Sequence, residues 1–405
     1  MLLLTLAANA GCSRKSVLAP NVPAPEAARA AEQFRHRHAN DQAVHLEGTS
    51  ESGALWVIDK PAAWNRSLVV YLHGYTVPSA PVALPNNAGV RDSLLARGYA
   101  VAASSYSSNG FAVPEGIRDS DELRGIFRRN VAEPRHTYLF GRSLGGLIGM
   151  LMTQRMPEHY DGSLLVCGIV GGSTEEIQYI GDIRVLFDTM YPGVIPGDLE
   201  HSTPITDPNT QLIGPIVAAV TANPQGLGII QLLARHPLAG ANSQELVASL
   251  INAMGFSMQA GSDLYARCHN TSFFDNASYT YASAALPPPL LADINTRVHR
   301  YTRAPEAAAF LRRNGEPTSR LRIPMLSLHT TRDPTVPLFH EDLLAQELSS
   351  PLLIQRRVDR YGHDAFTPGE LMVHFNDMVN FANAQHGDHD DDVVAGGALA
   401  GERQP

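Results

Sequence analysis

The pattern Gly-x-Ser-x-Gly at residues 141–145 is the strongest chemical feature of the sequence. Its serine, Ser143, follows an apolar run that predicts a strand, and an apolar helical pattern comes after it. So sharp a strand-to-helix turn strains the serine backbone, and Gly141 and Gly145 are needed because side chains there would collide across the turn. The turn presents the Ser143 hydroxyl as a nucleophile above the sheet, and the backbone N–H of Leu144 points toward an oxyanion.

A serine hydroxyl is a weak nucleophile near neutral pH, so it needs a base. His363 is the predicted base, since it follows the last predicted strand and Gly362 frees the loop to present the imidazole. Asp333 is the predicted acid that orients this imidazole, because it follows an earlier strand and Pro334 favours extended backbone before it. The sequence therefore predicts a Ser-His-Asp triad.

Other residues of the same types fit these roles less well. His340 and His374 lie in helical patterns and are more simply structural. Asp359 and Asp364 are too close to His363 in sequence to serve as its orienting acid.

The loop at residues 73–75 follows the apolar run 67–72 and predicts the second oxyanion donor. Gly74 allows close backbone approach, and the N–H of Tyr75 would join that of Leu144. His73 is expected to brace this loop through hydrogen bonds.

The elements that must position these residues alternate between strand and helix. This alternation predicts right-handed crossovers and a mostly parallel sheet flanked by helices. Predicted strands cover 54–59, 67–74, 99–106, 136–141, 163–170, 321–330 and 352–358, and predicted helices cover 86–98, 119–130, 144–156, 338–348 and a segment from about 368.

The alternation stops between about residues 172 and 320, where the sequence pattern predicts helices and loops. We therefore expect a catalytic domain over 46–172 and 321–385, interrupted between the nucleophile and the acid by a mainly helical cap over 173–320. Outside it, residues 13–45 read as a flexible tether and 386–405 as a disordered, acidic and Gly/Ala-rich tail.

The N-terminus and the overall charge bear on location and partners. Residues 1–12 end in Ala-Gly-Cys and resemble the end of a bacterial lipoprotein signal, which predicts export and a lipid-modified Cys12. The protein would then be periplasmic, lipid-anchored or secreted, with a membrane tether through Cys12.

A net charge of −9 without a basic stripe disfavours nucleic acid as a partner. The oligomeric state stays open.

Two further cysteines, Cys167 and Cys268, leave two alternatives. In an oxidising compartment they could form a disulfide, or they could be two buried free thiols.

The motifs GRSLGG, HGY, TRDPTVP and YGHDAF together resemble the α/β-hydrolase superfamily over about residues 50–172 and 321–385. A narrower likeness, in the segments KPAAWNRSLVVYLHGY and GYAVAASSYSSNGFAV, is to secreted bacterial hydrolases of esterase-like or prolyl-oligopeptidase-like type. The resemblance implies the α/β-hydrolase fold, the triad and oxyanion donors above, no metal and no organic cofactor.

The expected activity is hydrolysis of a small-molecule carboxylic ester through an acyl-enzyme. The cap is rich in residues that suit a hydrophobic or aromatic acyl group or form the cap's own core: Phe187, Tyr191, Leu232, Met254, Phe256, Phe273, Phe274, Tyr279 and Tyr281. A prolyl-oligopeptidase-like peptidase and an acyltransferase with the same triad are the alternatives, and a non-catalytic binding protein on this fold is a more remote one.

Overall fold

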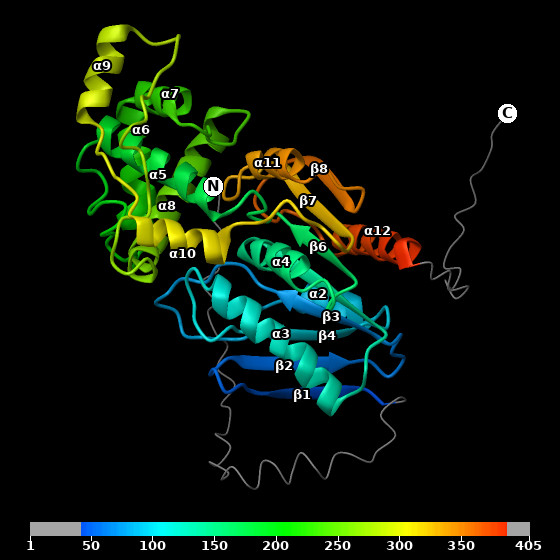
Figure 1. Ribbon diagram of the computed structural model, residues 1–405. Helices are drawn as coiled ribbons and strands as arrows, with labels where there is room; N and C mark the ends of the chain where they lie inside the picture. The colour runs from blue at the N-terminus through cyan, green and yellow to red at the C-terminus, as the bar shows by residue number, and fades with distance from the viewer. Residues whose placement is uncertain (1–41, 387–405) are drawn as a thin grey trace, which may run out of the picture. The chain divides into compact units, whose positions relative to one another are not determined.

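Eight strands form one sheet in the computed structural model, which describes residues 42–386 (Figure 1). The sheet order is β1-β2-β4-β3-β5-β6-β7-β8, and β2 alone runs against the other strands. The strands are β1 (Val44–Thr49), β2 (Leu55–Lys60), β3 (Ser67–Leu72), β4 (Ala100–Ser104), β5 (His136–Arg142), β6 (Gly162–Val166), β7 (Met325–Arg332) and β8 (Leu353–Tyr361). The expected mostly parallel sheet is confirmed, and its order is that of the α/β-hydrolase fold.

Helices cover both faces of this sheet, as continuous apolar strands require. On one face, α2 (Ala88–Leu95) and α12 (Pro368–His386) pack against the central strands, with Phe375 among Tyr138, Phe140 and Tyr99. On the other face lie α3 (Val113–Asn130), α4 (Leu144–Arg155) and α11 (Phe339–Glu347). Helix α4 is buried over ten of its twelve residues, so the element that follows Ser143 is firmly seated.

A helical segment between β6 and β7 forms the cap. It contains α5 (Ser173–Met190), a π-helical turn η1 (Asn209–Ile213), α6 (Gly214–Ala222), α7 (Pro224–Leu233), α8 (Ser243–Arg267), α9 (Pro288–Arg297) and α10 (Pro305–Gly315). These helices gather at one end of the sheet in Figure 1. By length and composition, none of the described helices could cross a membrane by itself, whereas Asn209–Ala222 and Pro224–Leu233, bent by 99°, meet that criterion jointly.

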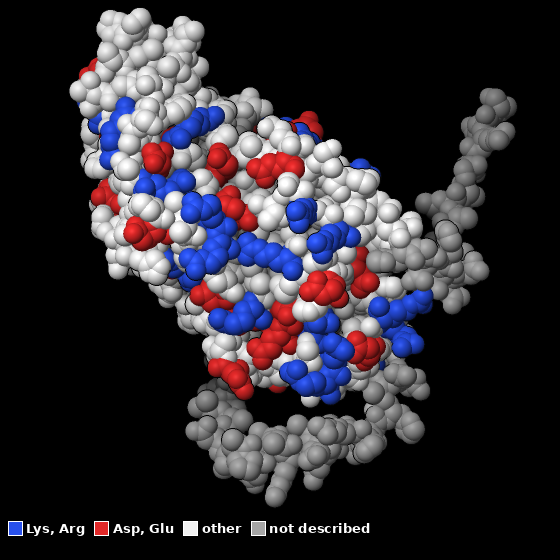
Figure 2. All heavy atoms as spheres, in the orientation of Figure 1, with Lys and Arg blue, Asp and Glu red and all other residues white. Residues whose placement is uncertain are grey.

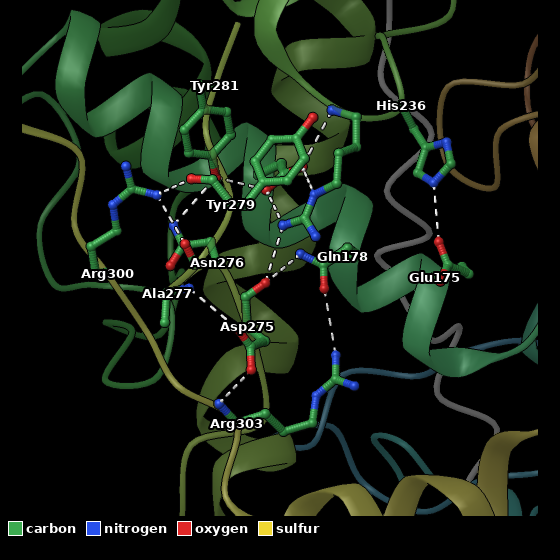
Figure 3. A network of polar contacts seen from close by, with 12 residues as sticks. Glu175, Gln178, His236, Asp275, Asn276, Ala277, Tyr279, Tyr281, Arg300 and Arg303 are labelled. Carbon is green, nitrogen blue, oxygen red and sulfur yellow. Dashed lines mark hydrogen bonds and ion pairs between the residues drawn. The ribbon is translucent and has the colours of Figure 1, made fainter. Parts of the chain in front are cut away.

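A polar network joins cap segments that are distant in sequence (Figure 3). The Arg235 guanidinium donates to both carboxylate oxygens of Asp182 at 2.7 and 2.8 Å and lies over the Tyr279 ring at 4.3 Å. The Tyr281 hydroxyl donates to the same carboxylate at 2.8 Å, and the Gln178 amide donates to the Asp275 carbonyl at 2.8 Å. Buried charges are tolerated here because each has several partners.

The structure differs from the sequence expectations mainly at element boundaries. Strand β1 was not expected; it begins at Val44, inside the range predicted as tether, and its residues alternate between half-buried and exposed as an edge strand's do. Helix α3 begins at Val113 rather than 119, with Pro114 in its first turn. Strand β6 ends at Val166 rather than 170.

Several sequence expectations fall outside the described residues. These are the signal-like segment 1–12 with Cys12, the tether up to residue 41, and the tail from residue 387.

Acidic and basic side chains are interspersed on the face of the molecule shown in Figure 2. An exposed ion pair of this kind joins Arg128 of α3 to Glu133 just after that helix, at 2.6 Å. The view shows few charges over the end of the cap that carries α9.

Candidate active site

Ser143 occupies the turn between β5 and α4, where its backbone is held in a strained conformation. Its φ is 56° and its ψ is −124°, and its N–H donates to the Val166 carbonyl at 2.9 Å. A Cβ on Gly145 would overlap the Leu72 carbonyl oxygen, and one on Gly141 would overlap the Gly145 carbonyl oxygen. Strain in a non-glycine residue persists only where the surroundings enforce it, which is typical of a functional serine.

Asp333 and His363 meet at the same edge of the sheet, after β7 and β8. The Asp333 carboxylate is fully buried and accepts the His363 Nδ1–H at 2.8 Å. Its other oxygen accepts the backbone N–H groups of Thr335 and Val336 at 2.8 and 3.0 Å. Because the proton is on Nδ1, the Nε2 of His363 is free to accept a proton.

A second contact ties the nucleophile loop to the histidine loop. Arg142, which precedes Ser143, lies with its Nε 3.2 Å from a carboxylate oxygen of Asp364, which follows His363. The His363 imidazole bonds to Asp333, and among the described residues no hydrogen bond joins it to the Ser143 hydroxyl. Such a bond is often formed only when substrate is present.

The carboxylates near His363 counteract the effect of burial on the pKa of its imidazole. Burial disfavours the imidazolium, but the carboxylates of Asp333 and Asp364 outweigh it and raise the pKa of His363 to about 9. For Asp333, burial would raise the pKa, but the neighbouring imidazole of His363 holds that pKa below its usual value. Asp333 therefore stays ionised, while His363 binds its proton more tightly than an isolated histidine does.

The loop at residues 73–75 lies against Ser143. A Cβ on Gly74 would stand 3.0 Å from the Ser143 Cβ and 3.5 Å from its Oγ, so only backbone fits there. The His73 Nδ1–H donates to the Gly74 carbonyl at 2.8 Å, and its ring stacks on Tyr106 at 3.8 Å. Burial lowers the pKa of His73, so this bracing side chain is neutral.

Cap helix α8 bonds to the loop after β3 and to the last residue of β8. On the oxyanion side, the Tyr75 hydroxyl donates to the Gln259 carbonyl at 3.2 Å, and its ring meets Phe256 edge-on at 5.6 Å. On the histidine side, the Tyr361 hydroxyl donates to the Glu245 carbonyl at 3.1 Å. Sequence periodicity held no sign of this helix position.

The same helix is anchored at its C-terminal end by Arg267. This guanidinium binds Asp263 one turn earlier at 3.0 Å, Glu115 of α3 at 3.1 Å and the Asn109 carbonyl at 2.9 Å. The cluster joins the cap to the loop after β4.

A small apolar cavity lies between α5 and α8. Phe256, which touches Tyr75, is one of its walls. The remaining lining residues are Ile177, Ile180, Leu199, Ser257, Ala260, Gly261, Leu264 and Phe273. Of the aromatic and apolar residues expected to form a pocket, Phe256 and Phe273 line this cavity. Phe187, Tyr191, Met254, Phe274 and Tyr281 are buried, Tyr279 packs under Arg235, and Leu232 is exposed.

Cys167 lies beside Asp333 and His363, and the three residues offer ligand atoms within 4.8 Å of one another. Two of those atoms, the His363 Nδ1 and an Asp333 oxygen, already share a hydrogen bond. Burial and the nearby Asp333 carboxylate raise the pKa of the Cys167 thiol, which keeps it protonated and makes it a poor metal ligand. The cluster fits a hydrogen-bonded dyad better than a metal centre.

The disulfide alternative is not formed. Cys167 and Cys268 are both free and buried. Cys167 follows β6 and faces Thr330, whereas Cys268 caps the end of α8, so each sulfur is enclosed by different elements.

The sequence matches no family model and no curated protein. Feruloyl esterase B from Aspergillus oryzae is a solved structure similar to this chain, at 13% identity and a TM-score of 0.47, covering 85% of this chain and 80% of its own. An esterase from Pyrococcus furiosus is 12% identical with a TM-score of 0.40, over 84% of this chain and 91% of its own. An acylaminoacyl peptidase from Pyrococcus horikoshii is 10% identical with a TM-score of 0.39, over 87% of this chain and 43% of its own.

The strand order with its single reversed strand, and the strained serine between β5 and α4, define an α/β-hydrolase fold. The chain thus has the α/β-hydrolase fold, with a helical segment inserted between β6 and β7.

Proposed function

We propose that this protein is a serine hydrolase that cleaves carboxylic esters, with Ser143 as nucleophile, His363 as base and Asp333 as orienting acid. One observation carries the proposal. A strained serine on a strand-to-helix turn stands at the sheet edge where a buried aspartate binds a histidine at 2.8 Å. This combination of a presented hydroxyl and an oriented imidazole is what acyl transfer requires.

The reaction would proceed in two halves. The Ser143 oxygen attacks the ester carbonyl carbon while its proton passes to the His363 Nε2, and the carbonyl oxygen becomes an oxyanion facing the N–H groups of Leu144 and Tyr75. Collapse of this intermediate expels the alcohol, which takes the proton from His363. Water then attacks the acyl-serine by the same route and releases the acid.

The acyl group would be hydrophobic or aromatic. The cavity between α5 and α8 is walled almost wholly by apolar side chains and adjoins Tyr75 through Phe256. An apolar chain gains about 25 cal/mol for each Å² that leaves water, so such a cavity favours apolar acyl groups over charged ones.

A fluorophosphonate probe and an ester panel test the proposal. The wild type should be labelled, and Ser143→Ala should lose both labelling and hydrolysis of p-nitrophenyl esters. Ser120→Ala is the matched control, because the Ser120 hydroxyl likewise has no hydrogen-bond partner among the described residues. An unlabelled but folded wild type would refute the proposal.

Two further substrates separate the alternatives. Faster cleavage of a proline-containing peptide anilide than of any ester would favour a peptidase. Formation of a new ester with an added alcohol, at the expense of hydrolysis, would favour an acyltransferase.

A further inference from the structure

A second histidine lies behind the acid of the site. His329 on β7 is fully buried, and its Nε2 stands 3.7 Å from the Asp333 carboxylate oxygen that also binds His363. The same Nε2 is 2.8 Å from the Val336 carbonyl. On its other side, His329 Nδ1 is 3.4 Å from a carboxylate oxygen of Glu341 on α11.

Glu341 is held in its ionised form by hydrogen-bond donors. It is fully buried, and its oxygens contact the Ser327 hydroxyl and the Gln355 amide, the latter at 2.6 Å. The amide N–H can only donate, so the oxygen that it contacts must accept. Burial would raise the pKa of Glu341, but His329 in the first place, and then the Ser327 and Gln355 donors, hold that pKa below its usual value.

Both ring nitrogens of His329 therefore face acceptors. A carbonyl oxygen can only accept, which places a proton on Nε2. Nδ1 makes no hydrogen bond among the described residues, but the Glu341 carboxylate 3.4 Å away is an acceptor that favours a proton there. An imidazole with protons on both nitrogens is positively charged. Although burial disfavours that charge, Glu341 and Asp333 outweigh burial and raise the pKa of His329.

We propose that His329 is a positioning residue: a charged imidazolium, paired with Glu341, that keeps Asp333 ionised and offsets part of the Asp333 charge felt by His363. This inference rests on the proposed function, since it assigns His329 a role in tuning the catalytic base. The array thus extends from His363 through Asp333 and His329 to Glu341, four side chains from the loop after β8, the loop after β7, β7 itself and α11.

Other titratable groups surround this array and must be considered with it. They are Glu176 on α5, His340 on α11, Cys167 after β6, and Asp364 beside His363. Among them His340 offers a contrast. Its Nδ1 accepts the Gly171 N–H at 3.1 Å while its Nε2–H donates to Glu176 at 2.8 Å, so this equally buried imidazole is neutral.

The decisive variant is His329→Gln, which keeps a donor for the Val336 carbonyl and removes the charge. With less positive charge nearby, His363 holds its proton more tightly, so the acidic limb of the kcat/KM profile should move upward by at least about half a pH unit. His340→Gln, which removes no charge, should leave that limb in place. A limb that stays put or moves downward in His329→Gln would overturn the proposal.

Histidine NMR on the wild type gives a second readout that needs neither the variant nor a substrate. The Cε1–H resonance of His329 should keep its imidazolium position from pH 5 to pH 9. A resonance that titrates to the neutral form within this range would overturn the assignment.

The two measurements separate this inference from the proposed function. If the wild type cleaves no ester, the esterase proposal fails, and the upward shift of the His363 titration in His329→Gln, followed by NMR, still decides whether His329 tunes it. If esters are cleaved but His329 titrates, only the present inference fails.

Discussion

Ser143 and His363 are positioned by different kinds of interaction. The serine is held by its backbone, since its strained φ of 56° is imposed by the turn between a buried strand and a buried helix. The histidine is held by side chains, chiefly the Asp333 carboxylate at 2.8 Å. A change of charge near the sheet edge should therefore alter the base far more than the nucleophile.

The pH profile of ester hydrolysis tests this view of His363. A base acts only when unprotonated, and the carboxylates near His363 raise its pKa to about 9, so kcat/KM should still be rising above pH 7. Asp364→Asn removes one of these carboxylates and should move the limb to lower pH by about half a unit or more.

Asp359→Asn is the control for that variant. Asp359 is 83% exposed and pairs with Arg332, so its loss should leave the limb unchanged. A wild-type limb at the ordinary histidine value of 6.5 would contradict the expected effect of the two carboxylates.

The sequence predicted the residues that a local pattern or chain order identifies. Gly-x-Ser-x-Gly marks Ser143, and strand ends mark Asp333 and His363. The pair of Arg142 with Asp364 was missed because its members are 222 residues apart and no local pattern links the two motifs that contain them. His329 was missed for a similar reason, since a histidine within an apolar strand reads only as a core residue.

At the scale of elements, close contacts between backbones determine how the site is built. The turn into α4 passes so near the end of β3 that a Cβ on Gly145 would overlap the Leu72 carbonyl oxygen and stand 2.6 Å from that of His73. The nucleophile turn and the oxyanion loop therefore cannot move independently.

Gly145→Ala should destabilise the protein by more than about 3 kcal/mol, because backbone cannot yield as a side chain can. Thermal unfolding measures the loss. Gly228→Ala in α7 is the matched control, since no atom lies within 4 Å of the added Cβ, and it should be neutral or stabilising by up to about 1 kcal/mol. Equal stability of Gly145→Ala and wild type would contradict this account.

The anchor at the end of α8 provides a second test among elements. Arg267→Met leaves Asp263 and Glu115 without their partner, and because the cluster is mostly buried the loss should cost about 1–3 kcal/mol. It should also raise the KM for esters, because α8 carries Phe256 beside Tyr75.

Urea unfolding and ester kinetics measure these two effects. Arg297→Met is the control, since its ion pair with Asp293 is about half exposed and should contribute under about 1 kcal/mol. A smaller loss for Arg267→Met than for Arg297→Met would show that the anchor is unimportant.

The cap illustrates what periodicity could not predict about elements. Its helical content was expected, but its internal order depends on contacts such as Tyr281 with Asp182, 99 residues apart, and Arg235 with Asp182, 53 residues apart. No local pattern encodes which arginine meets which aspartate. Edge strand β1 was missed because VHLEGT has little continuous apolar character.

At the scale of the whole molecule, buried ionisable groups make stability depend on pH. Burial lowers the pKa of His340 to about 3, from an ordinary value of 6.5. Between pH 6.5 and pH 3 the unfolded chain therefore binds a proton at His340 that the folded protein does not bind. The stability that neutral His340 contributes is complete above pH 6.5 and is lost as pH falls toward 3. On the alkaline side, His363 contributes stability below pH 6.5 that is lost as pH rises through about 9.

Removal of the His340 imidazole should flatten the acidic side of this stability curve. In His340→Asn the free energy of unfolding should fall less steeply between pH 6.5 and pH 3, the difference reaching a few kcal/mol. Urea unfolding at a series of pH values gives the slope. His45→Gln is the control, since His45 is exposed and its replacement should keep the wild-type slope. If the stability curve of His340→Asn ran parallel to that of the wild type, the assignment of this pH dependence to His340 would be wrong.

Helix α8 is supported at both ends, by Tyr361 at one and by Tyr75 and Arg267 toward the other. Because α8 is bonded to the rest of the protein at both ends, any large movement of this helix would break both sets of contacts together. We therefore expect substrates to reach Ser143 alongside α8. The size of substrate that is admitted would then depend on the side chains next to this helix rather than on opening of the cap.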